Sequence, residues 1–423
     1  MTMQHNKKWV RGLAAGAAGL MLASTAQAQI TLAENEDGWK VMMMGLVSVW
    51  SGIEDFDEAS GRPAEQTTRV ITGFNPSKLE FLAFAPEYNG ISVSAYFQLA
   101  TSINGAKTRR TGEQIEVRAA DISVAGSFGT FSLGRSFAIH DSLAIVNDTG
   151  SMRGVGYICT GPDGAGPNCG HIGTGYTWTD WTSGIRYATP RVSGLQLRIG
   201  AFDPIEAAFG EPAGFTPVIN DSTFSLQNFS AFGAAIDTST PLIEADVTYS
   251  YGWDSGTLLA WASGMYQDVE TNEGPGSTSL EAFSLGGRLT YKSDAGVFGL
   301  TGNWTDTQGI AEGFMGFGVR CNATACDAVE GNQWYANADF TFGGKTTIGV
   351  SYGEGSEEAN AVIGNGAVDR ELLMAYIQHN ITPNLNLNIE LQSFERKSDG
   401  FAAGLFLPNE EYDAILVGAE FRF

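Results

Sequence analysis

The chain ends in Ala414-Ile415-Leu416-Val417-Gly418-Ala419-Glu420-Phe421-Arg422-Phe423, where every second residue from Ile415 to Phe423 is apolar. Because successive side chains of a β-strand point to opposite faces, this spacing predicts a strand with one apolar face. The same two-residue period recurs in residues 91–99 and 385–392. The pattern predicts an all-β fold. It fits both a soluble sandwich, whose apolar face is the core, and a membrane barrel, whose apolar face meets lipid.

The lengths of the segments and of their connections favour the barrel. The alternating segments are about ten residues long, which suits a strand that crosses a bilayer at a tilt. Aromatic residues gather near the segment ends, where an interfacial girdle would lie, at Trp253, Trp304, Trp334, Tyr335, Tyr352 and Tyr376. Long polar or Gly-rich connections alternate with short turns, at residues 87–90, 127–129, 190–194, 254–256, 293–296, 343–344 and 382–384. A transmembrane antiparallel β-barrel with short periplasmic turns and long outer loops requires this alternation.

The direction of the last strand fixes the strand count. Marking every plausible strand gives seventeen, but seven short turns followed by a strand that ends in the periplasm require an even number. Treating residues 204–241 as one outer loop, with 222–238 inside it, leaves about sixteen strands, with fourteen and eighteen as rivals. Residues 136–179 then form the third long connection.

The N-terminus predicts export. Lys7, Lys8 and Arg11 precede an uncharged stretch at 13–23, and Ala26-Gln27-Ala28 has the small-x-small pattern of a cleavage site. A retained membrane anchor is the alternative, but the stretch is short for a hydrocarbon layer of about 30 Å. We therefore expect a signal peptide at 1–28 and a mature barrel domain at 29–423.

The charge of the chain excludes one class of partner. The net charge is −23 and becomes about −26 when the three basic residues of the signal peptide are removed. Such a surplus argues against a nucleic-acid partner, which needs basic surface to neutralise phosphates. In a channel, the same surplus predicts a mild preference for cations.

Two regions resemble a known family. Residues 124–135 look like a short-turn hairpin that ends in Leu133-Gly134-Arg135, and residues 184–195 look like the hairpin that follows it. The ending at 418–423 and, more weakly, residues 77–81 add to the likeness. Together they resemble the general bacterial porins, which are trimers of sixteen-stranded barrels in the Gram-negative outer membrane.

The resemblance implies roles for particular residues. The third loop of that family folds into the lumen and carries acids that face a basic cluster on the wall. By position, Lys78 and Arg118 match two of the wall bases and Asp148 matches a loop acid, whereas Arg153 stands where a second loop acid is expected. Phe423 matches the terminal aromatic residue that the barrel-insertion machinery reads. Outer-membrane lipid and two further copies of the chain are the other implied partners.

The residues themselves also indicate a pore. A barrel of about sixteen strands is too wide for side chains to fill, so it encloses water unless it is plugged. Loop acids facing wall bases would filter ions, and the candidate constriction residues are Lys78, Arg118, Arg135, Asp141, Asp148, Arg153, Arg186 and Arg198. Simple alternation puts Arg118 on the apolar face of Ile122, so its place in the lumen needs a bulge or a strand end.

The cysteines predict disulfides rather than a metal site. Cys159 and Cys169 lie in the 136–179 connection, and Cys321 and Cys326 lie in another long connection. Exported proteins mature in an oxidising compartment, which favours two local disulfides. A four-cysteine metal site is the alternative, but the two pairs are far apart and neither forms a Cys-x-x-Cys motif. No metal and no cofactor is predicted.

The sequence is consistent with three hypotheses for the function. A channel for passive diffusion of ions and small hydrophilic solutes is the first, and a channel specific for one substrate such as a sugar is the second. A non-conducting barrel that acts as an adhesin or an enzyme is the third. Catalysis is disfavoured because His140-Asp141-Ser142 is contiguous, whereas catalytic triads are assembled from distant positions.

Overall fold

The structure, a computed structural model, describes most of the chain that follows the predicted signal peptide. The described residues are 29–57, 64–104, 115–159, 166–205, 236–237, 240–271, 277–315, 318–321, 326–359, 366–399 and 409–423. The predicted signal peptide, residues 1–28, lies outside this set, as does most of the predicted loop 204–241.

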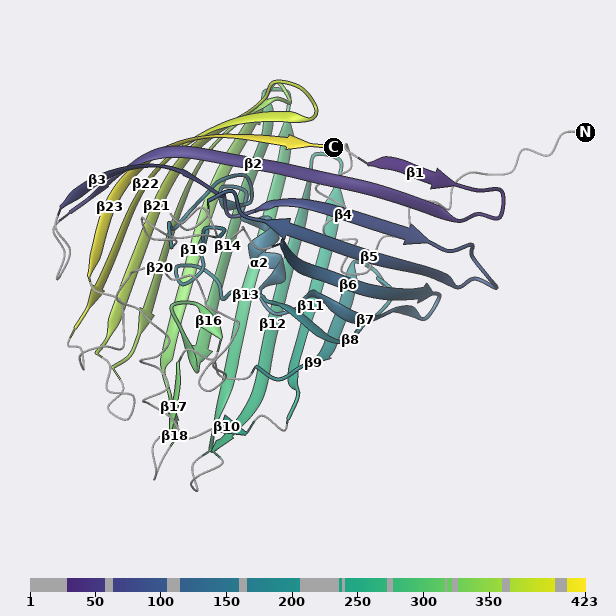
Figure 1. The fold of residues 1–423 in the computed structure, drawn as a ribbon, viewed down its shortest axis with the longest axis horizontal. Coiled ribbons are helices and arrows are strands. Elements are labelled where there is room, and N and C mark those ends of the chain that lie inside the picture. The colour runs from purple at the N-terminus through teal and green to yellow at the C-terminus, as the bar shows by residue number, and fades with distance from the viewer. Residues whose placement is uncertain are drawn as a thin grey trace, which may run out of the picture.

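Sixteen wall strands form a closed antiparallel barrel (Figure 1). In chain order they are β2 (Lys40–Phe56), β4 (Ser77–Phe84), β5 (Ser92–Thr101), β6 (Ile115–Gly126), β7 (Gly129–Phe137), β8 (Trp181–Ala188), β9 (Leu195–Phe202), β11 (Leu242–Trp253), β12 (Gly256–Thr271), β13 (Ser277–Ser293), β14 (Gly296–Gln308), β19 (Glu330–Phe342), β20 (Thr346–Glu357), β21 (Val368–Asn380), β22 (Leu385–Ser398) and β23 (Glu410–Arg422). Pairing of β2 with β23, from Leu46 opposite Arg422 to Phe56 opposite Tyr412, closes the ring. The predicted all-β barrel of sixteen strands is confirmed.

Shorter strands extend this wall or fold inside it. β3 (Glu65–Ile71) pairs with the outer half of β2, so β3 and β4 together make one wall strand with a break between them. β1 (Ile30–Glu34) pairs with the other end of β2. The remaining short strands are β10 (Ile236–Asp237), β15 (Ile310–Ala311), β16 (Phe314–Met315), β17 (Val319–Cys321) and β18 (Cys326–Ala328).

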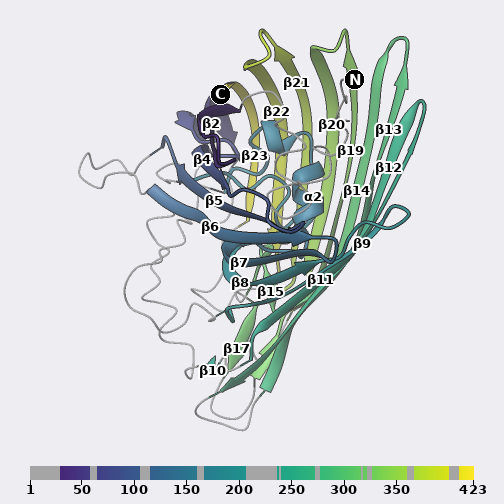
Figure 2. The same ribbon diagram turned by 90° about the vertical axis from the view of Figure 1, so that its right-hand side faces the viewer.

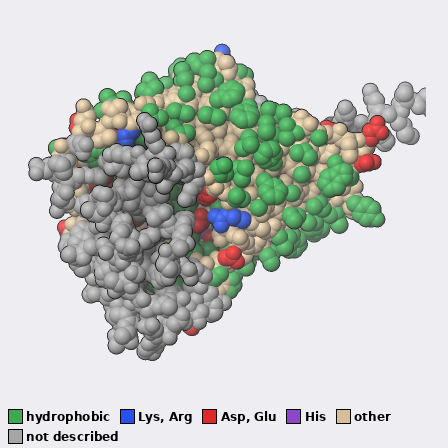
Figure 3. Space-filling model, viewed as in Figure 1, with side chains coloured by type: hydrophobic (Ala, Val, Ile, Leu, Met, Phe, Trp, Pro, Cys, Tyr) green, Lys and Arg blue, Asp and Glu red, His purple; other side chains and the backbone are tan. Residues whose placement is uncertain are grey.

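The burial of the strands decides between sandwich and barrel. On β22, Leu387, Ile389 and Leu391 are 44–48% exposed, whereas Asn388 and Glu390 between them are 1% and 0% exposed. Apolar side chains therefore face outward and polar side chains face inward, the reverse of a soluble protein. Figure 3 shows the result as hydrophobic side chains spread across the strands of the outer surface.

The seven predicted short turns all connect neighbouring strands of the ring. At the turn between β19 and β20, Gly343 and Gly344 have φ angles of 58° and 64°, a left-handed conformation that glycine adopts without strain. The longer connections leave the opposite end of the barrel. None of the described helices has the length and apolar character needed to cross a membrane.

The third outer connection lies within the ring of strands. We call residues 138–180 the inward loop; the structure describes 138–159 and 166–180 of it. It contains the helix α2 (Ser142–Asn147) and the 3₁₀ turn η1 (Ser151–Arg153). Both views place α2 inside the barrel (Figures 1 and 2).

Candidate channel constriction

Two wall carboxylates hold the inward loop at its start and near its tip. Glu244 on β11 accepts hydrogen bonds from the backbone amides of Ile139 and His140, at 2.5 and 2.8 Å. Glu390 on β22 accepts the amides of Val155 and Gly156, both at 2.9 Å. Hydrogen bonds from an amide to an ionised carboxylate are among the stronger ones in proteins. Because β11 and β22 lie on nearly opposite sides of the sixteen-strand ring, these bonds stretch the loop across the lumen.

Neutral hydrogen bonds attach the loop between these two clamps. Tyr335 on β19 donates to the carbonyl of Ala144 at 2.8 Å, and Gln378 on β21 donates to the carbonyl of Thr149 at 3.0 Å. The ring of His171 lies 2.7 Å from the hydroxyl of Ser351 on β20. The loop is therefore attached to β19, β20 and β21 between the two clamps.

Aromatic rings add packing at the loop tip. Tyr157 of the loop stacks on Phe394 of β22 with ring centroids 4.1 Å apart, and Phe394 stacks in turn on Tyr412 of β23 at 5.4 Å. All three rings are buried. Arg396 donates to the Tyr157 hydroxyl at 2.9 Å, so the phenol keeps a partner inside the protein. These aromatic residues hold the loop and do not line a path for solutes.

The two predicted loop acids do not face the opening. Asp141 is 1% exposed and accepts both the amide and the hydroxyl of Thr177, at 2.8 and 3.0 Å. Asp148 is fully buried and accepts the amide of Ser151 at 3.1 Å and the hydroxyl of Tyr176 at 2.8 Å. Both carboxylates stabilise the inside of the loop. The order of residues in the sequence does not predict this burial.

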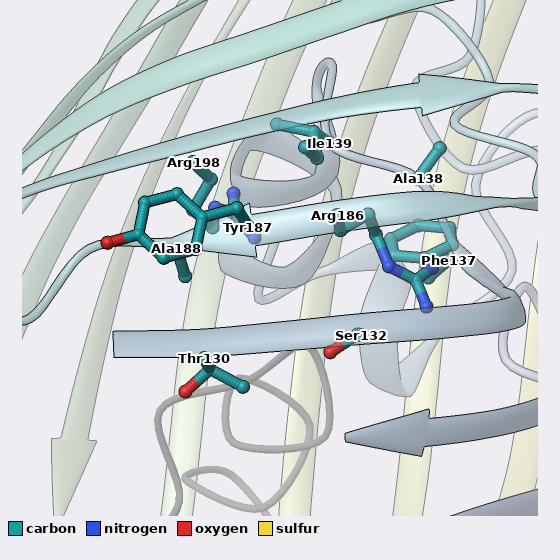
Figure 4. Close-up of a pocket in the computed structure, with 9 residues that line it drawn as sticks. All are labelled: Thr130, Ser132, Phe137, Ala138, Ile139, Arg186, Tyr187, Ala188 and Arg198. Atoms are coloured by element: carbon teal, nitrogen blue, oxygen red, sulfur yellow. The ribbon is translucent and has the colours of Figure 1, made fainter. Parts of the chain in front are cut away.

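The wall arginines Arg186 and Arg198 point inward, as their alternation with apolar residues predicts. Arg186 on β8 pairs with Asp121 on β6 at 2.5 Å. Arg198 on β9 pairs with Asp246 on β11 and donates to the hydroxyl of Ser142 at 3.0 Å. Figure 4 shows both arginines beside a small cavity at the start of the inward loop. Each positive charge is therefore balanced by a carboxylate on the neighbouring wall.

A β-bulge brings Arg118 into the lumen. Gln98 on β5 pairs with Ala119, but the next residue, Leu99, pairs with Val117, so Arg118 is the extra residue of β6. Its guanidinium lies 6.0 Å from the ring centre of Trp181, a cation–π contact. Simple alternation would place Arg118 on the outward, apolar face of the strand. The bulge shifts the alternation by one residue, so Arg118 can face the lumen as expected.

Lys78 lies on the inner face of β4 and Arg135 does not share that face. Lys78 is 3.6 Å from the carboxylate of Glu80. Arg135 pairs with Ala120 and Ser183, on the same side of its strand as Leu133, which is exposed on the outside. The strand register therefore does not bring Arg135 together with the other candidate bases.

Arg153 ends the η1 turn at the tip of the loop. Burial lowers the pKa of its guanidinium, repulsion from Arg422 lowers it further and attraction to Glu420 opposes both. These influences place Arg153 near the periplasmic end of β23. Arginine stays charged at any ordinary pH, so the loop tip carries a positive charge where an acid was expected.

A second connection also reaches inward, which sequence reasoning missed. We call residues 310–315 the β15–β16 hairpin; it follows β14 and pairs Ile310 with Met315. Its Glu312 lies 3.0 Å from Arg370 on β21 and 3.9 Å from Arg396 on β22. The carbonyl of Gly313 accepts the amide of Trp178 in the inward loop at 2.8 Å. The sequence signal is slight: one glycine, Gly309, precedes the hairpin and another, Gly313, lies at its tip.

A disulfide joins Cys159 and Cys169 within the inward loop. Cys321 and Cys326 lie opposite each other on β17 and β18, and their side chains lie outside the described set, so their disulfide stays a prediction. The described residues contain no group of three His, Cys, Asp or Glu that could hold a metal ion.

One constellation resembles a catalytic triad. The hydroxyl of Ser263 on β12 lies 3.2 Å from Nδ1 of His140, and the other ring nitrogen lies 3.4 Å from the carboxylate of Asp141. All three are buried, and burial lowers the pKa of His140 below its usual value. A nucleophile with no access to solvent cannot meet a substrate, so this group is a structural network.

The family assignment agrees with this geometry. A model of the Gram-negative porin family matches residues 12–399. The chain belongs to that family. The porin is therefore an outer-membrane channel of a Gram-negative bacterium through which small solutes pass.

Solved structures share the fold at low sequence identity. The anion-selective porin from Comamonas acidovorans is 15% identical, with 91% of this chain and 100% of that chain covered and a TM-score of 0.58. The outer-membrane channel DcaP of Acinetobacter baumannii is 13% identical, with 93% of this chain and 100% of that chain covered and a TM-score of 0.63. OmpT of Vibrio cholerae in its trimer form is 11% identical, with 92% of this chain and 100% of that chain covered and a TM-score of 0.51. No curated protein matches the chain.

Proposed function

We propose that the porin is a water-filled channel for passive diffusion of ions and small hydrophilic solutes. The observation that carries this proposal is the polar inner wall of a sixteen-strand barrel, which is too wide for its own side chains to fill. Glu244 and Glu390 hold the inward loop at two nearly opposite points of the wall. Inner-wall side chains such as Lys78 on β4 and Arg422 on β23 keep partial access to solvent.

Planar-bilayer recording tests the channel directly. Purified, folded protein should produce discrete conductance steps in KCl, and liposomes that contain it should swell at rates that fall smoothly as sugar size increases. A barrel that folds and gives no steps would contradict the proposal and favour the adhesin or enzyme hypothesis. A swelling rate that depends on sugar identity at fixed size would favour the substrate-specific alternative. The buried state of Tyr157, Phe394 and Tyr412 argues against an aromatic sugar path.

The mild cation preference predicted from the net charge has little support in the lumen. Asp141 and Asp148 are buried in the loop, and the wall bases Arg186 and Arg198 are paired with acids. The surplus of negative charge therefore acts through other parts of the molecule, and ion preference depends on the charges nearest the opening.

We also propose that the mature chain starts after residue 28, enters the outer membrane through recognition of its C-terminal strand and assembles as a homotrimer in outer-membrane lipid. One structural neighbour, OmpT of Vibrio cholerae, is described in a trimer form. The shortness of β8 and β9, at 8 residues each, supports the same assembly. Strands that face lipid need about 9–11 residues to cross it.

A further inference from the structure

Strand β20 lacks side chains at two successive positions of its inner face. Alternation puts Ser351, Gly353, Gly355 and Glu357 on the side that faces the lumen, and all four are buried. Glycine inside a strand often marks a place where another backbone approaches closely. We call the space over Gly353 and Gly355 the β20 groove.

Larger side chains on the neighbouring strands form the two sides of the β20 groove. Tyr335 and Gln333 of β19 lie opposite the glycines on one side. Leu372 and Arg370 of β21 lie opposite them on the other side. None of these four residues is more than 4% exposed. The groove is therefore one strand wide, with side chains along its sides and only backbone at its floor.

A turn of the inward loop, residues 171–176, fills the β20 groove. A Cβ added at Gly353 would overlap the carbonyl oxygen of Thr174. One added at Gly355 would overlap the carbonyl oxygen of Gly173. Because both overlaps are with backbone atoms, no side-chain rotation relieves them, and the turn itself would have to move.

Polar groups at both ends of the β20 groove hold the structures inside the lumen. At one end, the hydroxyl of Ser351 lies 2.7 Å from the ring of His171 in the turn. At the other end, Glu357 accepts the amide of Glu312 in the β15–β16 hairpin at 2.6 Å. The inward loop and the hairpin are therefore fixed to the same stretch of β20.

The 171–176 turn is also bonded to the rest of the inward loop and to the hairpin. Tyr176 donates to Asp148 in the first half of the loop at 2.8 Å. The amide of Trp178, just after the turn, donates to the carbonyl of Gly313 in the hairpin at 2.8 Å. A shift of the turn away from β20 would therefore carry both structures toward the opposite wall, which is near β7 in the ring of strands.

We propose that Gly353 and Gly355 set the solute-size limit of the pore, because the β20 groove accommodates a loop backbone that would otherwise lie deeper in the lumen. The inference rests on the proposed channel function and assigns its size selectivity to two positioning residues. They act through the place of the inward loop and do not need to touch a solute. Side chains at these positions would narrow the pore without changing its charge.

Polymer exclusion tests the proposal. Single-channel conductance in KCl is measured with polyethylene glycols of increasing size, because polymers that enter the pore lower the conductance and larger ones do not. Gly353→Ala should lower the conductance and shift the exclusion limit to smaller polymers, with the barrel still heat-modifiable. Gly302→Ala is the matched control. It adds the same methyl group to the outer face of β14, where the nearest atom, the carbonyl oxygen of Tyr335, is 3.5 Å from the added Cβ.

Gly355→Ala is a second variant and should shift the exclusion limit in the same direction. An unchanged limit in a folded groove variant would overturn the proposal, as would an equal shift from Gly302→Ala. If neither groove variant gave a heat-modifiable barrel while Gly302→Ala did, the glycines would serve the wall and not the size limit, which also overturns it. A folded wild-type barrel with no conductance would instead contradict the proposed channel function, so the two failures are distinguishable.

Discussion

The carboxylate of Glu390 is the residue on which the position of the loop tip depends most directly. Glu390→Ala leaves the buried amides of Val155 and Gly156 without an acceptor, and each unsatisfied donor costs about 1–3 kcal/mol. We expect the tip to leave the wall, which single-channel recording should register as larger current fluctuations. Glu411→Ala, which changes an exposed carboxylate of β23, is the control. Quiet currents of wild-type size from Glu390→Ala would show that other contacts hold the tip.

The Cys159–Cys169 disulfide should restrain the same region independently. It closes a loop with a sequence separation of 10, for which chain entropy gives about 3 kcal/mol. Because the barrel wall does not depend on it, the double variant Cys159→Ser, Cys169→Ser should keep the melting temperature of the folded barrel. Protease digestion should cut the variant inside the inward loop faster than the wild type. Equal digestion rates would mean that wall contacts alone order the loop.

Single residues also show where sequence reasoning stops. The inward direction of Arg186 and Arg198 follows from alternation, because their sequence neighbours are apolar and therefore point outward. Arg118 could not be placed that way, since the bulge that turns it inward depends on the register of β5. The burial of Asp148 was equally hidden, because it depends on Tyr176, 28 residues further along a loop with no regular period.

At the scale of elements, we expect the β15–β16 hairpin to narrow the lumen together with the inward loop. Replacing residues 310–315 by two glycines removes Glu312 and its ion pairs with Arg370 and Arg396. Both arginines keep a second carboxylate, Glu357 or Glu410, so the wall should remain folded. We expect a higher single-channel conductance than in the wild type. Unchanged conductance would show that the hairpin lies beside the ion path and does not constrict it.

Strands and turns were predictable for a reason that does not extend to this hairpin. A wall strand must alternate and must end where the membrane ends, so the seven short turns follow from local pattern. Local pattern alone gave seventeen strands, and the direction of the last strand reduced the count to sixteen. The break between β3 and β4 has no such signal. It occurs where the carbonyls of Thr72 and Gly73 accept hydrogen bonds from Asn168 of the inward loop, a contact that only the folded barrel creates.

At the scale of the whole molecule, Phe423 closes the seam of the barrel. Its backbone exchanges hydrogen bonds with Gly45 of β2, and a Cβ added to Gly45 would lie 2.3 Å from the Phe423 ring. Gly45→Val therefore displaces the phenyl ring of Phe423 from its packing position over β2 but leaves the C-terminal aromatic residue intact. If insertion depends on recognition of that residue, Phe423→Ser should lower the heat-modifiable barrel in outer membranes more than Gly45→Val does. If Gly45→Val lowered the amount of barrel more than Phe423→Ser, Phe423 would act only in closing the seam and not in recognition.

The uneven height of the wall predicts where copies of the porin meet. β8 and β9 have 8 residues each, whereas β14 has 13, so the side of the wall next to β7 is too short to face about 30 Å of hydrocarbon by itself. Leu133 on β7 and Leu300 on β14 point outward with matched exposures of 45% and 44%. Leu133→Lys should convert the proposed trimer to monomers, because an unpaired charge would be buried between copies. Leu300→Lys faces lipid, where lysine costs about 2–4 kcal/mol at the midplane, and should lower barrel stability without changing the oligomeric state. Light scattering in detergent measures the first effect and urea unfolding the second; dissociation by Leu300→Lys alone would put the interface on the other side of the barrel.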